Sequence, residues 1–318
     1  MRAVFFGTPA IAVPALRALA DIGELVGVVC QPDRPAGRGL TLTEPAVKQA
    51  ARELGVSAHQ PVKVKTGALH EWLASLNADV AVVLAYGRIL PAAVLSAPRL
   101  GCLNLHASVL PKYRGAAPIN WAIVHGEDHT GISLMHMDEG LDTGPVYTRH
   151  SLAIGELETA GELAQRLAEL AAEVVRRDVP RVVCGELRAT PQNDSEATFA
   201  PPLTREHSRI DWSQSARSIV NLVRGMAPRP GAHTTLRGKA LRVLAARPAP
   251  ELTLPAEQAS LLPGSLKILG RSKVCVSTGE GLVELLRAQL EGKKELAASD
   301  LVNGRALAEG DVLGEAPR

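Results

Sequence analysis

The sequence predicts an α/β fold in which a mostly parallel sheet forms a large N-terminal domain and short strands form a smaller C-terminal domain. Three observations predict this arrangement. The first half alternates short apolar runs with helix-like patterns, as βαβ units do. A nearly continuous β-branched run over Ala78–Ala85 suits a strand that is buried on both faces. After residue 207, strand-like runs recur between turn signals, which favours a small barrel or sandwich.

The same patterns place the elements of the first domain in chain order. Strands are predicted over Arg2–Phe6, Leu25–Cys30, Ala78–Ala85, Gly101–Leu105 and Gly131–Met137. Helices are predicted over Val13–Leu19, Ala46–Leu54 and Thr159–Arg177, the last with apolar residues at helical spacing. Open α/β sheets bind ligands beyond the carboxyl ends of their strands, so we look for chemistry there.

A polar, proline-containing stretch separates the two halves of the chain. Residues 190–207 suit an ordered linker better than a helix or a strand. We therefore predict a first domain at 1–189, a linker at 190–207 and a second domain at 208–318. Within the second domain a helix is predicted over Ile210–Arg224, and strands over Ala232–Leu236, Leu241–Ala245, Gly264–Ile268, Lys273–Thr278 and Leu282–Leu290.

Composition points to an ordinary globular protein of the cytoplasm. The 318 residues are 46% hydrophobic and 21% charged, which fits neither a disordered chain nor a membrane protein. No uncharged stretch approaches the ~20 residues that span a bilayer, and the N-terminal apolar run is too short for a signal peptide. We expect buried, reduced thiols at the four scattered cysteines, which are Cys30, Cys102, Cys184 and Cys275. No obligate protein partner is evident.

Two familiar motifs are absent, which disfavours two classes of enzyme. The first strand runs into Gly7-Thr8-Pro9 instead of a G-x-G-x-x-G turn, so an NAD enzyme is disfavoured. His125 and His129 have zinc-protease spacing but lack the Glu beside the first histidine. We therefore expect no metal there, and interpret both as surface histidines.

Positive charge is concentrated in one part of the second half. Between Thr204 and Pro250, Glu206 and Asp211 are the only acidic residues. Such a surplus of positive charge predicts a footprint for a polyanion, although a solvated arginine-rich surface explains the same count. The basic residues of this stretch are Arg205, Arg209, Arg217, Arg224, Arg229, Arg237, Lys239, Arg242 and Arg247.

A polar constellation follows the strand predicted at Gly101–Leu105. Period-two alternation puts Asn104 and His106 on one face of that strand. A histidine can act as general base or acid near neutral pH, and a carboxamide can donate to a developing oxyanion. Asp142 follows in a glycine-rich loop after the next strand and could stabilise an imidazolium. Taken alone, an Asn–His pair is more often structural than catalytic.

A family resemblance changes that balance. The stretch Asn104–Gly115, followed by Gly140–Gly144, resembles the signature of the 10-formyltetrahydrofolate-dependent formyltransferases. Matches at Phe6–Pro9, Gln31–Gly39 and Ala85–Pro91 resemble the members of that family that act on methionyl initiator tRNA. The resemblance implies a Rossmann-like catalytic domain, an OB-like C-terminal barrel, and formyl transfer to the methionyl α-amino group for translation initiation.

The resemblance also implies a role for individual residues and requires no metal. His106 would accept a proton from the attacking amine, Asn104 would steady the negative oxygen of the tetrahedral intermediate, and Asp142 would support the histidine. The folate would be bordered by two loops and by Asp138, through residues Ser108, Val109, Leu110, Pro111, Arg88, Ile89 and Leu90.

Contacts to tRNA are expected from both halves. The loop Gln31–Lys48 is much longer than the ~2–6 residues of a usual βα connection, and in the family it enters the acceptor end. Leu40 and Thr41 stand where lysines are common, so this loop is less basic. No aromatic residue follows Trp212, so the second domain is expected to dock on phosphates instead of stacking on bases. The predicted RNA contacts are Arg34, Arg38, Lys48, Arg205, Arg237 and Lys239.

Three other functions remain open from the sequence. A formyltransferase acting on a small amine, such as glycinamide ribonucleotide or an aminosugar nucleotide, would keep the same three polar residues. A hydrolase that deformylates the folate could use them to activate water. A noncatalytic RNA-binding protein would explain the charge but would leave the three residues without a purpose.

Overall fold

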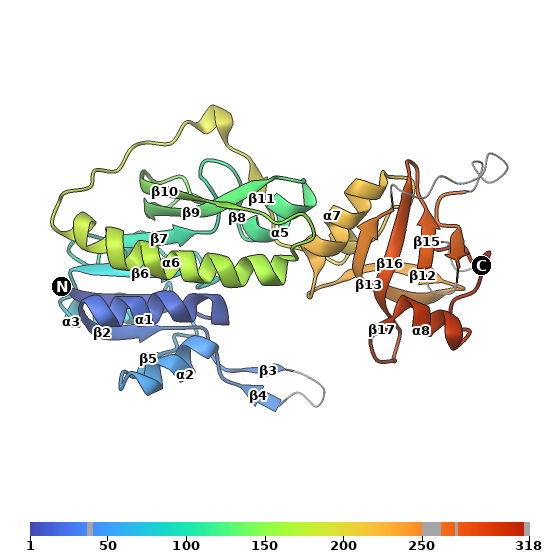
Figure 1. Ribbon diagram of the computed structural model, residues 1–318. Coiled ribbons are helices and arrows are strands. Elements are labelled where there is room, and N and C mark those ends of the chain that lie inside the picture. The colour runs from blue at the N-terminus through green and yellow to red at the C-terminus, as the bar shows by residue number, and fades with distance from the viewer. Residues whose placement is uncertain (37–40, 250–261, 271–272, 315–318) are drawn as a thin grey trace. The chain divides into compact units, whose positions relative to one another are not determined.

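The computed structural model describes residues 1–36, 41–249, 262–270 and 273–314 (Figure 1). The chain divides into two compact units. The first comprises Met1–Pro118, His129–Ala153 and Ala164–Pro201, and the second comprises Ile119–Asp128, Ile154–Leu163 and Pro202–Arg318. Each unit is therefore built from segments that are separate in the sequence.

A seven-stranded, mostly parallel sheet forms the centre of the first unit. In spatial order its strands are β10 (Val146–Ala153), β9 (His129–His136), β7 (Cys102–His106), β6 (Val80–Leu84), β1 (Arg2–Gly7), β2 (Glu24–Val29) and β5 (Ala58–His59). Strands β5, β2, β1, β6 and β7 pair in parallel, whereas β9 and β10 are antiparallel. The predicted Rossmann-like sheet is confirmed.

Helices cover this sheet because their apolar faces need a partner. The helices are α1 (Val13–Ile22), α2 (Ala46–Glu53), α3 (Ala68–Ser75), α4 (Ala92–Leu95) and α6 (Ala160–Val183). Helix α3 buries Leu69 and Leu73 in a cluster with Val4 and Phe6 of β1. Figure 1 shows α1 and α6 side by side, and Arg17 of α1 and Glu173 of α6 line one shallow crevice.

The strand order reverses between β1 and β6, which is where doubly wound sheets bind ligands. The hydroxyl of Thr8, just beyond β1, donates to the Tyr86 carbonyl beyond β6, at 3.1 Å. The Gln31 amide, just beyond β2, donates to the same carbonyl, also at 3.1 Å. These bonds fix the loops at the carboxyl edge, beside the end of β7 that carries His106.

The second unit contains an antiparallel sheet that closes on itself. Its elements are α7 (Ala216–Met226), β12 (Ala232–Leu236), β13 (Lys239–Pro248), β14 (Leu266–Leu269), β15 (Lys273–Ser277), β16 (Leu282–Leu290), β17 (Leu296–Ala297) and α8 (Ala298–Asn303). The order is β12-β13-β16-β15-β14, with β17 beside β16. Leu313 bridges Leu236 of β12, and Val312 bridges Ser265 next to β14. This closure agrees with the expected small barrel.

Several elements differ from the prediction or were not predicted. Helix α7 begins at Ala216 instead of Ile210, because the Ser215 hydroxyl caps it by accepting from the Ser218 amide. Strand β10 was missed since its sequence, VYTRHSLA, lacks a strong apolar alternation. The other short elements are η1 (Ala10–Ala12), β3 (Arg34–Ala36), β4 (Thr41–Thr43), β8 (Arg114–Gly115), α5 (Pro118–Val124), η2 (Asp194–Glu196), β11 (Phe199–Ala200) and η3 (Glu206–Ser208).

Two expectations drawn from composition can be compared with the structure. Cys30, Cys102 and Cys275 are buried, but Cys184 is exposed, so the expectation of four buried thiols was wrong at that position. Cys184 lies directly after the last residue of α6, Val183. Among the described residues, no helix is both long and apolar enough to cross a membrane.

A buried carboxylate joins α6 to β10. Asp178 is 1% exposed. Its oxygens accept hydrogen bonds from Thr148 (2.8 Å), His150 (2.7 Å) and Arg177 (3.0 Å). Burial alone raises the pKa of this carboxyl, but the hydrogen bonds from Arg177, Thr148 and His150 outweigh it and hold the pKa below the ordinary value of 3.8.

We predict that Asp178→Asn lowers the free energy of unfolding at pH 7 by about 1.5–3 kcal/mol, the usual contribution of hydrogen bonds to a charged group. A depressed pKa stabilises the fold above the unfolded-state value and loses that effect as pH falls through the folded-state value. Urea unfolding between pH 7 and pH 3 should therefore show a smaller loss of stability in the variant. Glu186→Gln, which breaks an exposed ion pair, is the control. Equal stability of Asp178→Asn and wild type would contradict this account.

Candidate active site

The three residues predicted to be catalytic lie together in the first unit. Asn104 and His106 belong to β7, and Asp142 lies in the loop that connects β9 to β10. The Asn104 amide donates to Asp142 Oδ1 at 3.2 Å. Asp142 Oδ2 is 3.6 Å from Nδ1 of His106, whose side chain is 6% exposed. A base, an amide donor and a carboxylate therefore face one another.

The hydrogen bond made by Nε2 of His106 shows which ring nitrogen can take up a proton. Nε2 lies 2.8 Å from the backbone carbonyl oxygen of Tyr113. A carbonyl oxygen only accepts, so Nε2 carries the hydrogen and donates it. In the neutral ring Nδ1 is then the basic nitrogen, and it is the one that faces Asp142.

Asp142 is held from several directions. Its backbone has φ 53°, in the left-handed region that residues other than glycine rarely adopt. The Gly115 amide donates to its Oδ2 at 2.9 Å. The loop returns to the sheet through Gly144, where a Cβ atom would lie 1.9 Å from the His136 carbonyl oxygen. Only glycine fits at that position, which explains the glycine two residues after Asp142.

The loop predicted to border the folate follows β7 directly. Ser133 of β9 pairs with His106 in the sheet and holds this loop at two points. Its hydroxyl donates to the Ser108 carbonyl at 2.7 Å and accepts from the Leu110 amide at 3.0 Å. Leu110 is buried, and its carbonyl accepts from Arg149 at 2.6 Å. The Ser108–Pro111 loop is thus fixed beside β7.

The second predicted folate loop, Arg88–Leu90, follows β6, which pairs with β7. Leu90 is buried in the core, whereas Ile89 is 75% exposed. The Arg88 guanidinium donates to Gln31 Oε1 (2.9 Å) and to the Val62 carbonyl (2.6 Å). The Arg88 side chain therefore braces the loop, and a ligand here would meet the backbone and Ile89.

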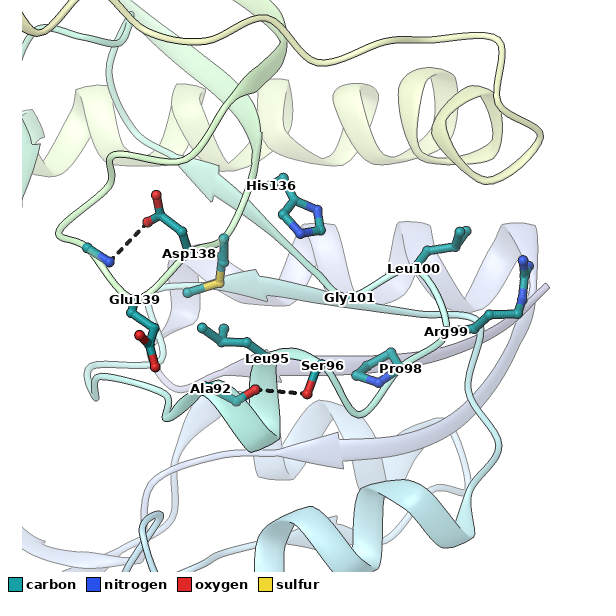
Figure 2. Close-up of a pocket in the computed structure, with 12 residues that line it drawn as sticks. Ala92, Leu95, Ser96, Pro98, Arg99, Leu100, Gly101, His136, Asp138 and Glu139 are labelled. Atoms are coloured by element: carbon teal, nitrogen blue, oxygen red, sulfur yellow. Dashed lines mark hydrogen bonds between the residues drawn. The ribbon is translucent and has the colours of Figure 1, made fainter.

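A broad pocket of about 800 Å³ lies in the same unit (Figure 2). Asp138 is the one predicted folate residue that lines it, and the Gly140 amide and the Thr143 hydroxyl bond its carboxylate. Figure 2 shows one wall formed by the His136–Gly140 stretch and the other by α4 and the loop after it. The lining residues are Ala92, Leu95, Ser96, Pro98, Arg99, Leu100, Gly101, His136, Met137, Asp138, Glu139 and Gly140.

The predicted RNA contacts of the first unit surround the hairpin formed by β3 and β4. Arg34 is exposed on β3, whereas Arg38 and Leu40 lie outside the described residues. Lys48 is paired with Asp33 (2.6 Å) and Glu44 (3.2 Å). The hydrogen bond with Asp33 is the main reason why the pKa of Lys48 is raised. Lys48 thus joins α2 to the chain before β3.

In the second unit, part of the positive charge counted from the sequence serves internal contacts. Arg237 makes a forked ion pair with Asp311, and Arg242 donates to the Pro230 carbonyl. Three more of the basic residues are similarly engaged: Arg217, Arg224 and Arg247. Within the described residues the remaining four are exposed and make no ion pair: Arg205, Arg209, Arg229 and Lys239. The sequence count therefore overestimated the charge available to a polyanion.

The second unit also contains an aromatic side chain that the sequence argument did not assign to it. Residues 119–128 belong to this unit, which places Trp121 in it. The Trp121 ring is partly buried and lies 5.1 Å from the His207 ring, edge to face. The second unit therefore contains an aromatic ring from outside residues 208–318, the range of the predicted second domain.

Residues 190–201 support the Asp142 loop and the chain after β7 through contacts that were not predicted from the sequence. Gln192 donates to the carbonyl oxygens of Asp142 and Gly144, and Thr198 accepts from the Tyr113 amide. Phe199 and Ala200 form β11, which pairs with Arg114 and Gly115 of β8. Nothing in a polar, proline-containing stretch predicts such contacts. Among the described residues, no group of three His, Cys, Asp or Glu side chains could hold a metal ion.

Comparisons with known proteins agree on one family. The family models "Formyl transferase" and "Formyl transferase, C-terminal domain" match residues 1–179 and 202–306. The chain is 60% identical, over 99% of its length and 100% of the relative's, to the methionyl-tRNA formyltransferase of Sorangium cellulosum. It is 45% identical to that of Pelotomaculum thermopropionicum, over 99% of each chain.

A solved structure gives the same fold. HypX from Aquifex aeolicus, in complex with tetrahydrofolic acid, is 19% identical with a TM-score of 0.64; the match covers 97% of this chain and 48% of that protein. At this identity the likeness concerns the fold alone. The two family models together cover most of the sequence, and the relatives match along nearly its entire length. The chain therefore belongs to the formyl transferase family.

Proposed function

We propose that this protein transfers the formyl group of 10-formyltetrahydrofolate to the α-amino group of methionyl initiator tRNA. The convergence of Asn104, His106 and Asp142 at the end of β7 is the observation that carries the proposal. Relatives of matching length bear the corresponding name, which supports the choice of acceptor. Protein synthesis takes place in the cytoplasm, so we expect the enzyme there.

Each of the three residues has a chemical role in this reaction. Nδ1 of His106 accepts the proton that the amine loses as its nitrogen bonds to the formyl carbon. One amide hydrogen of Asn104 bonds Asp142, and the second is available to the oxyanion of the tetrahedral intermediate. The Asp142 carboxylate stabilises the imidazolium. His106 then returns the proton to the departing folate nitrogen as the carbon–nitrogen bond to the folate breaks.

The structure supports a donor site on the loops around β7. The Ser108–Pro111 loop is fixed by Ser133 beside His106, and the Arg88–Leu90 loop follows the adjacent strand. We propose that these loops border the folate and that its pterin lies against the Asp138–Asp142 loop. A donor bound there would lie beside the end of β7, which carries His106.

We propose that the tRNA is bound by the exposed basic residues of both halves. Residues 1–189 would supply the chemistry and, through Arg34 of the β3–β4 hairpin, a contact to the tRNA; Arg38, outside the described residues, is proposed as a further contact on the basis of the sequence. Residues 208–318 would supply phosphate contacts, with 190–207 linking the two. Contacts to phosphates release counterions, so binding should weaken steeply as salt rises.

The acceptor is tested directly by transfer of labelled formyl from 10-formyltetrahydrofolate to charged initiator tRNA, with elongator methionyl-tRNA as the specificity control. We expect labelling of the initiator only. His106→Ala should lower kcat by about 10²–10⁴-fold, the usual contribution of a general base. Absence of labelling by folded protein that binds folate would reject the tRNA assignment and favour a small amine acceptor.

Arg237 lies in the turn between β12 and β13, and Lys239 is the first residue of β13. Lys239 is exposed and makes no ion pair among the described residues, whereas Arg237 is paired with Asp311. Lys239→Ala should raise the KM for tRNA and reduce the salt slope of binding by about one, while the KM for the folate stays unchanged. Arg237→Ala should mainly lower thermal stability. An unchanged salt slope in Lys239→Ala would remove this residue from the RNA contacts.

A further inference from the structure

Gln192 makes four hydrogen bonds through its side-chain amide. Nε2 donates to the carbonyl oxygens of Asp142 and Gly144, both at 2.8 Å. Oε1 accepts from Nε (3.1 Å) and Nη2 (2.9 Å) of Arg114. Because carbonyl oxygens only accept and a guanidinium only donates, these partners fix the orientation of the amide. To make the same four bonds, a side chain needs both an oxygen that accepts and a nitrogen that donates two hydrogens.

Gln192 is itself held firmly. Arg114 is 4% exposed, and its Nη2 also donates to Asp194 Oδ1 at 2.7 Å. Hydrogen bonds from a charged donor are stronger than neutral ones, and a buried guanidinium requires partners. Two residues before Gln192, Thr190 exchanges both backbone hydrogen bonds with Val146, each at 2.9 Å. Gln192 is therefore held by its side-chain oxygen and by the backbone bonds of the nearby Thr190.

The two carbonyls that Gln192 binds lie on either side of Thr143, in the loop that carries the catalytic carboxylate. Asp142 has a left-handed backbone, a conformation that persists only where the surroundings determine it. Fixing the carbonyls of Asp142 and Gly144 determines the path of the loop at this position. The distance from Asp142 Oδ2 to Nδ1 of His106, 3.6 Å, follows from that path.

We propose that Gln192 is a positioning residue of the reaction: held by buried Arg114, it fixes the Asp142 loop so that the carboxylate faces His106. The inference rests on the proposed function, since it assumes that Asp142 takes part in formyl transfer. Gln192 acts through Asp142 and has no role of its own towards the substrate. A residue of the stretch between the two predicted domains is then part of the catalytic arrangement.

The test uses Gln192→Glu in the full-length enzyme, assayed for formyl transfer. Glutamate has nearly the same shape and keeps a partner for Arg114, but it has no hydrogen to donate to the two carbonyls. We expect kcat to fall about 10–100-fold, since misplacement of a catalytic group by about 1 Å can cost about 10²-fold, and the KM for tRNA to change little. Gln192→Met, which also lacks the donor, should show the same loss.

A double-mutant cycle distinguishes positioning from a general effect on the fold. In an Asp142→Asn background, Gln192→Glu should lower kcat little further, because the group it positions is already gone. If the fold-losses in kcat of the two single variants multiply in the double variant, the proposal is overturned. A wild-type kcat in both Gln192 variants would also overturn it. Glu196→Gln is the matched control: this exposed carboxylate of the same segment accepts from the Asn193 side chain at 2.9 Å, so kcat should remain near wild type.

Hydrogen–deuterium exchange supplies a readout that does not depend on the acceptor. The backbone amides of residues 138–144 and of Val146 should exchange faster in Gln192→Glu than in wild type or Glu196→Gln. Unchanged exchange in this segment would overturn the proposal even if activity fell. If exchange is faster in Gln192→Glu but the wild-type enzyme formylates no tRNA, the contact between Gln192 and the loop is supported and the proposed function is rejected.

Discussion

The geometry of the candidate site depends on the position of one carboxylate. Asp142 accepts from the Asn104 side chain and the Gly115 backbone and faces the ring of His106. Its backbone adopts a left-handed conformation that costs roughly 1–3 kcal/mol for a residue with a side chain. The cost is offset by contacts from separate segments of the chain. A shift of this loop would disturb the base and the oxyanion donor together.

The sheet holds in place the strand that Asp142 faces. Strand β7 is bordered by parallel β6 on one side and antiparallel β9 on the other. The register with β9 puts Ser133 beside His106, and Ser133 in turn fixes the loop that leaves β7. The Tyr113 carbonyl at the end of that loop returns to bond His106. The histidine is therefore oriented by its own strand and by the chain that follows it.

Local sequence patterns predicted the strands of the site and the side chains that share one face of them. Period-two alternation places Asn104 and His106 on one face of a strand, and a buried β-branched run identifies β6. The role of Asp142 came from a family resemblance, because a glycine-rich loop alone does not reveal where it folds. Gln192 was not predicted, since its four bonds reach residues about 50 and 78 positions away.

Counting charges had a related weakness. A sequence reveals that Arg237 and Lys48 are basic but not that each has a carboxylate partner at 2.6 Å. Pairing of this kind depends on which segments the fold brings together. The distinction matters for function, because a paired guanidinium or ammonium must lose a partner before it can bind phosphate, whereas an exposed, unpaired one need not.

The central claim is that Nδ1 of His106 is the basic nitrogen opposite Asp142, because Nε2 donates to the Tyr113 carbonyl. Long-range proton–nitrogen NMR of the imidazole in the free enzyme tests it most directly. For the neutral ring, the account predicts a hydrogen on Nε2 and none on Nδ1. A neutral ring with its hydrogen on Nδ1 would contradict the account, since the nitrogen facing the site could then not accept a proton.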